Sequence, residues 1–140
     1  AGIGFRVVPG ITAGIGALAY AGIPLTTRNT NSAVTFITGY TAGGEIPKDI
    51  DWMALARGSP ALVFYMGAPH LKEIASQLMA AGRKPDEPVA VVSRATLPDQ
   101  KVLETTLARC ADDLAKTKLA APTLVVVGPI AALRREMPIS

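Results

Sequence analysis

Three short runs of apolar residues, each bounded by turn residues, constrain the fold of this 140-residue chain more than any other feature. The runs occupy residues 61–66, 89–92 and 123–127. Continuous apolar runs of this length are typical of strands that are buried on both faces of a sheet. Between the first two runs, residues 70–81 place apolar side chains three and four positions apart, which predicts an amphipathic helix. Strands that alternate with helices predict an α/β layer fold.

The remaining segments are expected to complete this fold. β-Branched or alternating stretches predict additional strands, and the segments between turn residues predict helices and a loop. The additional strands are expected at 5–8, 33–38 and 101–107, the helices at 13–21, 51–57, 108–119 and 130–137, and the loop at 40–48. Because only a short interval separates the strand at 101–107 from the helix that follows it, the sheet is expected to be mixed. The predicted fold class is therefore α/β, with a mixed, mainly parallel sheet of about five strands flanked by helices.

The composition argues against several classes of function. The net charge is +3, Lys and Arg are scattered, and 5% of the residues are aromatic, so no basic and aromatic platform for nucleic acid is visible. The longest apolar run is far shorter than the roughly 20 residues that a membrane span requires. A single histidine and a single cysteine provide no spacing typical of a metal site. We therefore expect no metal, no nucleic-acid partner and no membrane segment.

The cysteine, Cys110, has no second cysteine with which to form a disulfide inside the chain. It lies in a predicted helix, where an inert packing thiol is expected rather than a nucleophile. This cysteine content is typical of a reducing compartment, and a cytoplasmic location is expected.

Small residues gather where the predicted strands end or begin. These turns are residues 9–13 (PGITA), 65–67 (YMG), 93–96 (SRAT) and 122–123 (PT). Ligands of α/β sheets bind beyond the carboxyl ends of strands, and a helix that begins at Thr12 offers unpaired N–H groups. Together the turns predict a cleft for a small molecule. Each turn taken alone also fits an ordinary strand-to-helix connection, with Thr12 as a helix N-cap and Met66 as a core residue.

Four segments occur in an order that resembles a known family. They are VVPGITAGIGALAYAGIPLTTR, AVTFITGY followed by GGE, LVFYMG, and PTLVVVGPIAALR. The set resembles the second domain of the tetrapyrrole methylases from residue 1 to about residue 137, and it is most similar to the members that methylate uroporphyrinogen III. The resemblance implies an enzyme that binds S-adenosylmethionine between two α/β domains. It would transfer the methyl group to uroporphyrinogen III and form precorrin-2 for sirohaem and cobalamin biosynthesis.

The resemblance also implies roles for individual residues. Thr12 and Ala13 match the Thr-Ala cofactor contact of the family. Met66 matches the cofactor-contacting methionine of the YMG motif. Ala95 matches a small-residue contact, and Thr123 falls where the family often has Ala beside the cofactor.

Three further positions concern the substrate and the departures from the family pattern. Arg28 is a candidate partner for the carboxylates of the substrate, because arginine pairs with carboxylates in a bidentate manner; a structural salt bridge is an equally good account of it. Thr27 and Tyr40 both stand where many relatives have His.

The motifs of the family's first domain, a GxGPGD loop and a Gly-Gly-Asp loop, do not occur in this sequence. Residues 1–12 are therefore expected to be an interdomain tail and cofactor turn, and residues 13–140 the C-terminal domain, with the N-terminal domain absent. No catalytic residue is expected here, and the chain alone is expected to be inactive and to bind the cofactor weakly. A homodimer is expected, with the strand at 101–107 available for pairing. The alternatives are a methylase of a later precorrin or another acceptor, and a non-catalytic binding or dimerisation module.

Overall fold

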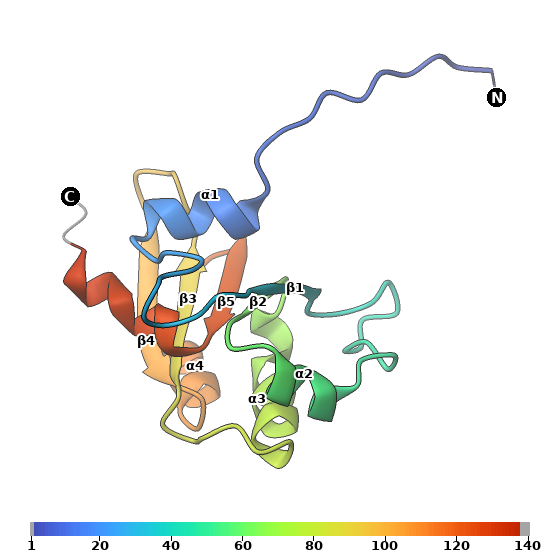
Figure 1. Ribbon diagram of the computed structural model, residues 1–140. Helices are drawn as coiled ribbons and strands as arrows, with labels where there is room; N and C mark the ends of the chain where they lie inside the picture. Colours follow the sequence, from blue (N-terminus) through green and yellow to red (C-terminus); the bar gives the residue numbers. More distant parts are fainter. Residues whose placement is uncertain (1, 138–140) are drawn as a thin grey trace.

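The structure, a computed structural model, describes residues 2–137 and has three layers, with a sheet between two groups of helices (Figure 1). The strands are β1 (Thr35–Thr38), β2 (Leu62–Tyr65), β3 (Pro88–Ser93), β4 (Lys101–Thr106) and β5 (Thr123–Val127). Within the described residues they form one five-stranded sheet in the order β1-β2-β5-β3-β4. The helices are α1 (Ala13–Tyr20), α2 (Trp52–Gly58), α3 (Leu71–Ala80) and α4 (Cys110–Thr117), with the 3-10 helices η1 (Ala68–His70) and η2 (Pro129–Glu136). The predicted α/β class with about five strands is confirmed.

The sheet is mixed, as expected, but it is not mainly parallel. Over residues 2–137, β1 and β2 pair in parallel, whereas β2 with β5, β5 with β3, and β3 with β4 pair antiparallel. The reason is that β5 inserts between β2 and β3 and runs opposite to both. Tyr65 lies opposite Leu124, and Ser93 lies opposite Thr123. The ends of β2 and β3 and the start of β5 therefore meet at one edge of the sheet.

The side chains of the central strands alternate between two hydrophobic cores, one on each face of the sheet. Leu62 and Phe64 of β2 pack in the core that includes α2, α3 and α4, whereas Val63 packs in the core that includes α1 and η2. Successive side chains of a strand point to opposite faces, which explains why the apolar runs are continuous. Each fully buried side chain of this size contributes roughly 1.5–3 kcal/mol relative to an exposed one.

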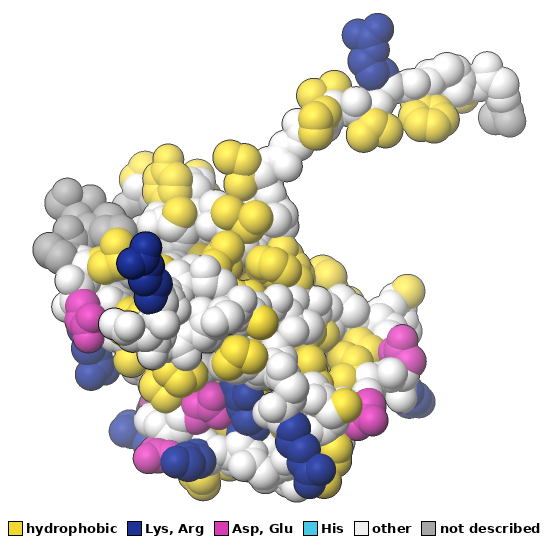
Figure 2. Space-filling view, in the orientation of Figure 1, with side chains coloured by type: hydrophobic (Ala, Val, Ile, Leu, Met, Phe, Trp, Pro, Cys, Tyr) yellow, Lys and Arg dark blue, Asp and Glu magenta, His cyan; other side chains and the backbone are white. Residues whose placement is uncertain are grey.

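Two predicted elements differ from the structure. Residues 5–8, which the sequence predicts as a strand, are extended but have no strand partner among residues 2–137, and Phe5 and Val7 are 90% and 78% exposed. Figure 1 shows this segment projecting away from the sheet, and Figure 2 shows its apolar side chains standing free. The closing helix, expected over 130–137, is a 3-10 helix over Pro129–Glu136.

The other predicted helices and strands are confirmed, with boundaries shifted by a few residues. The start of α2 follows ordinary capping rules, since the Asp51 side chain accepts a hydrogen bond of 3.0 Å from the backbone N–H of Ala54. None of the helices in residues 2–137 is both long enough and apolar enough to cross a membrane.

Candidate functional site

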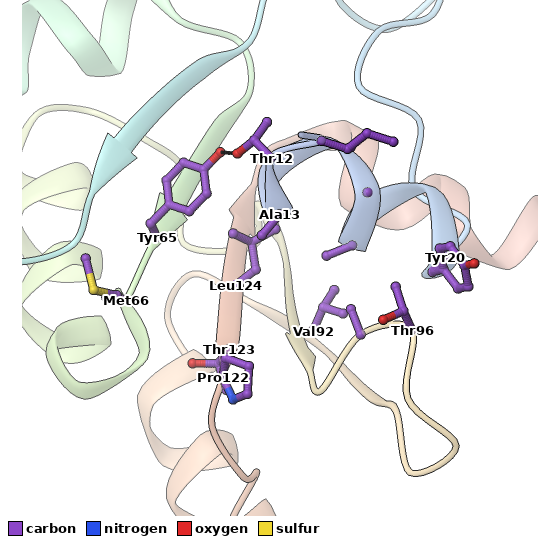
Figure 3. Close-up of a pocket in the computed structure, with 14 residues that line it drawn as sticks. Thr12, Ala13, Tyr20, Tyr65, Met66, Val92, Thr96, Pro122, Thr123 and Leu124 are labelled. Atoms are coloured by element: carbon purple, nitrogen blue, oxygen red, sulfur yellow. Dashed lines mark hydrogen bonds between the residues drawn. The ribbon is translucent and has the colours of Figure 1, made fainter. Parts of the chain in front are cut away.

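A cavity of about 490 Å³ opens under α1, at the edge of the sheet where β2 and β3 end and β5 begins (Figure 3). Its walls come from one face of α1 and the two residues before it, the ends of β2 and β3, the loop between β3 and β4, and the start of β5. Pockets of roughly 300–1,000 Å³ are typical of small-molecule sites. The lining residues are Ile11, Thr12, Ala13, Gly16, Ala17, Tyr20, Tyr65, Met66, Val92, Ala95, Thr96, Pro122, Thr123 and Leu124.

The structure brings together all of the residues that the resemblance assigns to the cofactor. The five that line this one cavity are Thr12, Ala13, Met66, Ala95 and Thr123. They come from segments that are far apart in the sequence and meet because the strands end at the same edge. Contact with a cofactor itself remains a prediction. Arg28 does not line the cavity; it is exposed in the turn between Thr27 and Asn31.

Small side chains on one face of α1 leave room for the cavity. Ala13, Gly16, Ala17 and Tyr20 are spaced by three and four positions, so they share one face of the helix, and all of them line the cavity. The first three extend no further than a methyl group. The helix can therefore lie over the edge of the sheet without filling the space beneath it.

Tyr65 anchors the N-terminus of α1 to the end of β2. Its hydroxyl shares a hydrogen bond of 2.5 Å with Thr12 Oγ1 and accepts one of 3.2 Å from the backbone N–H of Gly14 (Figure 3). Thr12 occupies the N-cap position, as predicted, but its own side chain does not cap the helix. A free N–H group at the start of α1 is thus satisfied by a tyrosine of another element.

Gly14 makes this anchor possible. A Cβ at this position would lie 2.5 Å from Phe36 Cε1 and nearer still to the Tyr65 hydroxyl. The helix can approach Tyr65 and Phe36 this closely because residue 14 has no side chain.

Two residues of the cavity wall have backbone angles that are rare for residues with a side chain. The φ angle is 55° at Met66 and 69° at Thr96, and it is 49° at Arg94, two positions before Thr96. This left-handed conformation costs roughly 1–2 kcal/mol for a residue other than glycine, and such residues cluster at functional sites. The surrounding structure therefore holds two turns of this wall in unfavourable conformations.

Within residues 2–137, the cavity wall carries hydroxyl groups but no charged side chain. The hydroxyl groups belong to Thr12, Tyr20, Tyr65, Thr96 and Thr123, and the other lining side chains are apolar or absent. A mostly apolar wall with a few polar groups suits a small ligand that has an apolar body and polar edges. Among the described residues that line the cavity, none is an acid, His or Lys that could act as a general acid or base.

The groups with a shifted pKa lie outside the cavity. Burial raises the pKa of Cys110 to about 11, so this thiol stays protonated near neutral pH. The Thr105 hydroxyl, and secondarily Arg109, lowers the pKa of Asp113. Over residues 2–137, no cluster of three or more His, Cys, Asp or Glu side chains is placed to bind a metal.

Sequence reasoning missed several residues of the wall. Gly16, Ala17 and Tyr20 could have been found from their helical spacing after Ala13. Val92 and Leu124 could not, because they enter the wall through the pairing of β3 with β5, where they lie opposite each other. Tyr65 belongs to a segment that the sequence did single out, but nothing in the sequence indicates that its hydroxyl reaches α1.

The family model of the tetrapyrrole (corrin/porphyrin) methylases matches residues 1–111 of this chain. A uroporphyrinogen-III C-methyltransferase from a Sinorhizobium species is 55% identical over 130 residues, which are 93% of this chain and 46% of that protein. A siroheme synthase from Acinetobacter baylyi is 45% identical over 137 residues, which are 98% of this chain and 30% of that protein. This chain therefore spans less than half the length of either relative.

A solved structure of a uroporphyrin-III C-methyl transferase also matches this chain. The crystal structure of uroporphyrin-III C-methyl transferase from Thermus thermophilus, complexed with S-adenyl homocysteine, matches with a TM-score of 0.75 and 32% identity. The match covers 91% of this chain and 54% of that chain. By sequence and by fold, the chain described here belongs to the tetrapyrrole (corrin/porphyrin) methylase family.

Proposed function

We propose that this chain is part of an S-adenosylmethionine-dependent methyltransferase that converts uroporphyrinogen III into precorrin-2, for sirohaem or cobalamin biosynthesis. The observation that carries the proposal is the convergence of Thr12, Ala13, Met66, Ala95 and Thr123 on one neutral cavity. The 55% identity to a uroporphyrinogen-III C-methyltransferase supports this acceptor over a later precorrin.

The residues of the cavity fit an S-adenosyl ligand. Ala13 and Ala95 add only methyl groups to the wall, so a flat ring can approach the backbone, and Thr12 and Thr123 provide hydroxyl groups for its polar edge. When bound, S-adenosylmethionine supplies a methyl group on a positively charged sulfur. The task of this chain is then to bind and orient the donor, since alignment accounts for much of the rate of a transfer between two bound molecules.

The groups that remove the proton of the acceptor are expected outside this chain. No charged side chain lines the cavity within residues 2–137. Apolar side chains of the cavity wall also remain open to solvent: Ile11 and Met66 are 83% and 48% exposed. Exposed apolar groups that border a cavity are typical of a surface that another domain covers. We expect a second domain to close the cleft and to supply the catalytic groups.

A titration of the 15N-labelled chain with S-adenosylhomocysteine tests the cofactor assignment. We expect amide shifts confined to the cavity wall, and a dissociation constant well above the micromolar range because this chain supplies only part of the cleft. Ala95→Val should weaken binding further by narrowing the cavity, whereas Ala80→Val, on an exposed position of α3, should not. Absence of shifts at the cavity at millimolar ligand would contradict the cofactor assignment. Micromolar binding would contradict the expected need for a second domain.

A chimera tests the reaction. The matching 130 residues of the Sinorhizobium enzyme are replaced by the corresponding part of this chain, and the product is analysed by mass spectrometry. We expect the chimera to add methyl groups from S-adenosylmethionine to uroporphyrinogen III, and this chain alone to add none. A folded chimera that binds S-adenosylhomocysteine but methylates only a later precorrin would favour the alternative acceptor. In the same chimera, Arg28→Ala should raise the KM for uroporphyrinogen III if Arg28 binds its carboxylates.

A homodimer and a cytoplasmic location complete the proposal. The dimer is supported by β4, an edge strand of the sheet with one side that no strand of residues 2–137 pairs with. The location is supported by the single, unpaired and buried cysteine. Light scattering after size-exclusion chromatography tests the dimer, and a monomer at all concentrations would contradict it.

A further inference from the structure

The loop between β3 and β4, residues 94–100, forms one wall of the cavity. Ala95 packs against a hydrophobic core and Arg94 pairs with Asp99, whereas residues 96–99 are exposed. The loop contributes Ala95 and Thr96 to the cavity, and both Arg94 and Thr96 hold left-handed backbone conformations. Thr96 is exposed, and Leu97 at the tip is 43% exposed. A short, exposed loop in an unfavourable conformation needs a specific contact to keep it in place.

Gln100 provides that contact with both halves of its amide group. Its Oε1 accepts a hydrogen bond of 2.9 Å from the backbone N–H of Thr96. Its Nε2 donates a hydrogen bond of 3.2 Å to the backbone carbonyl of Tyr20, the last residue of α1. One side chain thus connects the loop to a helix that lies 80 positions away in the sequence.

The carbonyl of Tyr20 has a particular need for this donor. The carbonyls of Ala17, Leu18 and Ala19 in the last turn of α1 accept hydrogen bonds from the backbone N–H groups that follow the helix. The carbonyl of Tyr20 accepts the Gln100 amide instead. Gln100 therefore completes the last turn of α1, whose carbonyl groups have no partner within the helix.

The two groups that Gln100 joins belong to residues that both line the cavity. Figure 3 shows Tyr20 and Thr96 on one side of it, with Tyr65 and Met66 on the other. Tyr65 of β2 is hydrogen-bonded to the start of α1, and Gln100 of the β3–β4 loop is hydrogen-bonded to the end of α1. The Gln100 bridge therefore joins the end of the helix to the loop on this side of the cavity.

We propose that Gln100 is a positioning residue for the cofactor site, and this rests on the proposed function. It does not line the cavity, and it acts by holding Thr96 and the end of α1 at the separation that a bound S-adenosyl ligand requires. Apparent affinity falls in proportion to the fraction of molecules in the competent conformation. Without the bridge, the loop spends part of its time away from the helix, so affinity falls while the fold remains.

Two substitutions separate the two hydrogen bonds. Gln100→Ala removes both. Gln100→Glu keeps an oxygen that accepts from Thr96, but it places a carboxylate oxygen against the Tyr20 carbonyl, where no donor remains. Gln77→Glu, an exposed position of α3 on the other face of the sheet, makes the same change in charge and is the matched control.

The first measurement needs no ligand. Hydrogen exchange of the Thr96 amide should become faster in Gln100→Ala and stay close to the wild-type rate in Gln100→Glu and Gln77→Glu. An unchanged rate in Gln100→Ala would overturn the bridge itself, whatever the chain binds.

The second measurement is the titration of each 15N-labelled chain with S-adenosylhomocysteine. Gln100→Ala and Gln100→Glu should both bind on the order of tenfold more weakly, and Gln77→Glu should bind as the wild type does. Gln100 variants that bind as tightly as the wild type would overturn the positioning role. A wild-type chain that shows no shift at the cavity would instead contradict the proposed function, while the exchange measurement still decides whether the bridge exists.

Discussion

The substitution Gly14→Ala sets two physical effects against each other. In a helix, Ala is favoured over Gly by about 1 kcal/mol, so propensity alone predicts that the variant is more stable. The structure predicts the opposite. The added Cβ would lie 2.5 Å from Phe36 Cε1 and nearer still to the Tyr65 hydroxyl, so the tyrosine would have to move.

The cost of that movement exceeds the gain. Tyr65 would lose its hydrogen bonds to Thr12 and to the Gly14 N–H, each of which contributes about 0.5–1.5 kcal/mol. Forcing an additional methyl group into a packed contact costs about 1–3 kcal/mol. After the gain in helix propensity is subtracted, we expect Gly14→Ala to lower the free energy of unfolding by roughly 1–5 kcal/mol.

Gly16 offers a matched control in the same helix. The nearest atom to a Cβ there is Ile11 Cγ2 at 3.4 Å, an ordinary contact. Gly16→Ala should therefore raise the free energy of unfolding by up to about 1 kcal/mol. Urea denaturation followed by circular dichroism measures both variants. If both substitutions changed the stability in the same direction and by the same amount, the close approach of α1 to Tyr65 would be refuted as the reason for glycine at position 14.

Three other predictions follow from groups outside the cavity. Arg83→Lys should lower the free energy of unfolding by about 2–4 kcal/mol, because the nearly buried guanidinium binds both carboxylate oxygens of Glu87 and a lysine ammonium cannot form this paired contact. Urea denaturation measures the change, and an unchanged midpoint would contradict the prediction. Cys110 should react with a thiol reagent only slowly at pH 8 in the folded chain, since burial raises its pKa to about 11, and quickly in urea; equal rates would contradict it. Thr105→Val should make the free energy of unfolding depend less on pH in the acid range. The reason is that the Thr105 hydroxyl lowers the folded-state pKa of Asp113 below its unfolded value of about 4. The resulting stabilisation is present above that pH and is lost as the pH falls through the folded pKa, so the difference in unfolding free energy between about pH 6 and about pH 3 should be smaller in the variant.

Local patterns in the sequence predict the elements of this fold better than their pairing. The run at 123–127 is recognisable as a buried strand, and the structure confirms it. Its insertion between β2 and β3 depends on contacts with segments that lie about 30 to 60 residues away, and no local pattern encodes them. The expectation of a mainly parallel sheet failed for that reason. The strand expected at 5–8 failed because a β-type sequence forms a strand only where a partner is present.

For the candidate site too, local sequence predicts individual residues better than the contacts between distant segments. The small residues at the strand ends and the family resemblance singled out Met66 and Ala95, which the fold brings to one cavity. The anchors of α1 were not foreseen. Tyr65 and Gln100 reach the helix from distant segments through single polar atoms, and a polar side chain in a sequence does not indicate which backbone group it will meet.

The absence of charged side chains from the described wall of the cavity has a consequence for turnover. The sulfur of the proposed methyl donor is positively charged before the transfer and neutral after it. A carboxylate near that sulfur would favour the charged form, and the described wall offers none. Under the proposed function, this part of the cleft should hold the spent molecule nearly as well as the fresh one, so the reaction would slow as by-product accumulates unless another enzyme removes it.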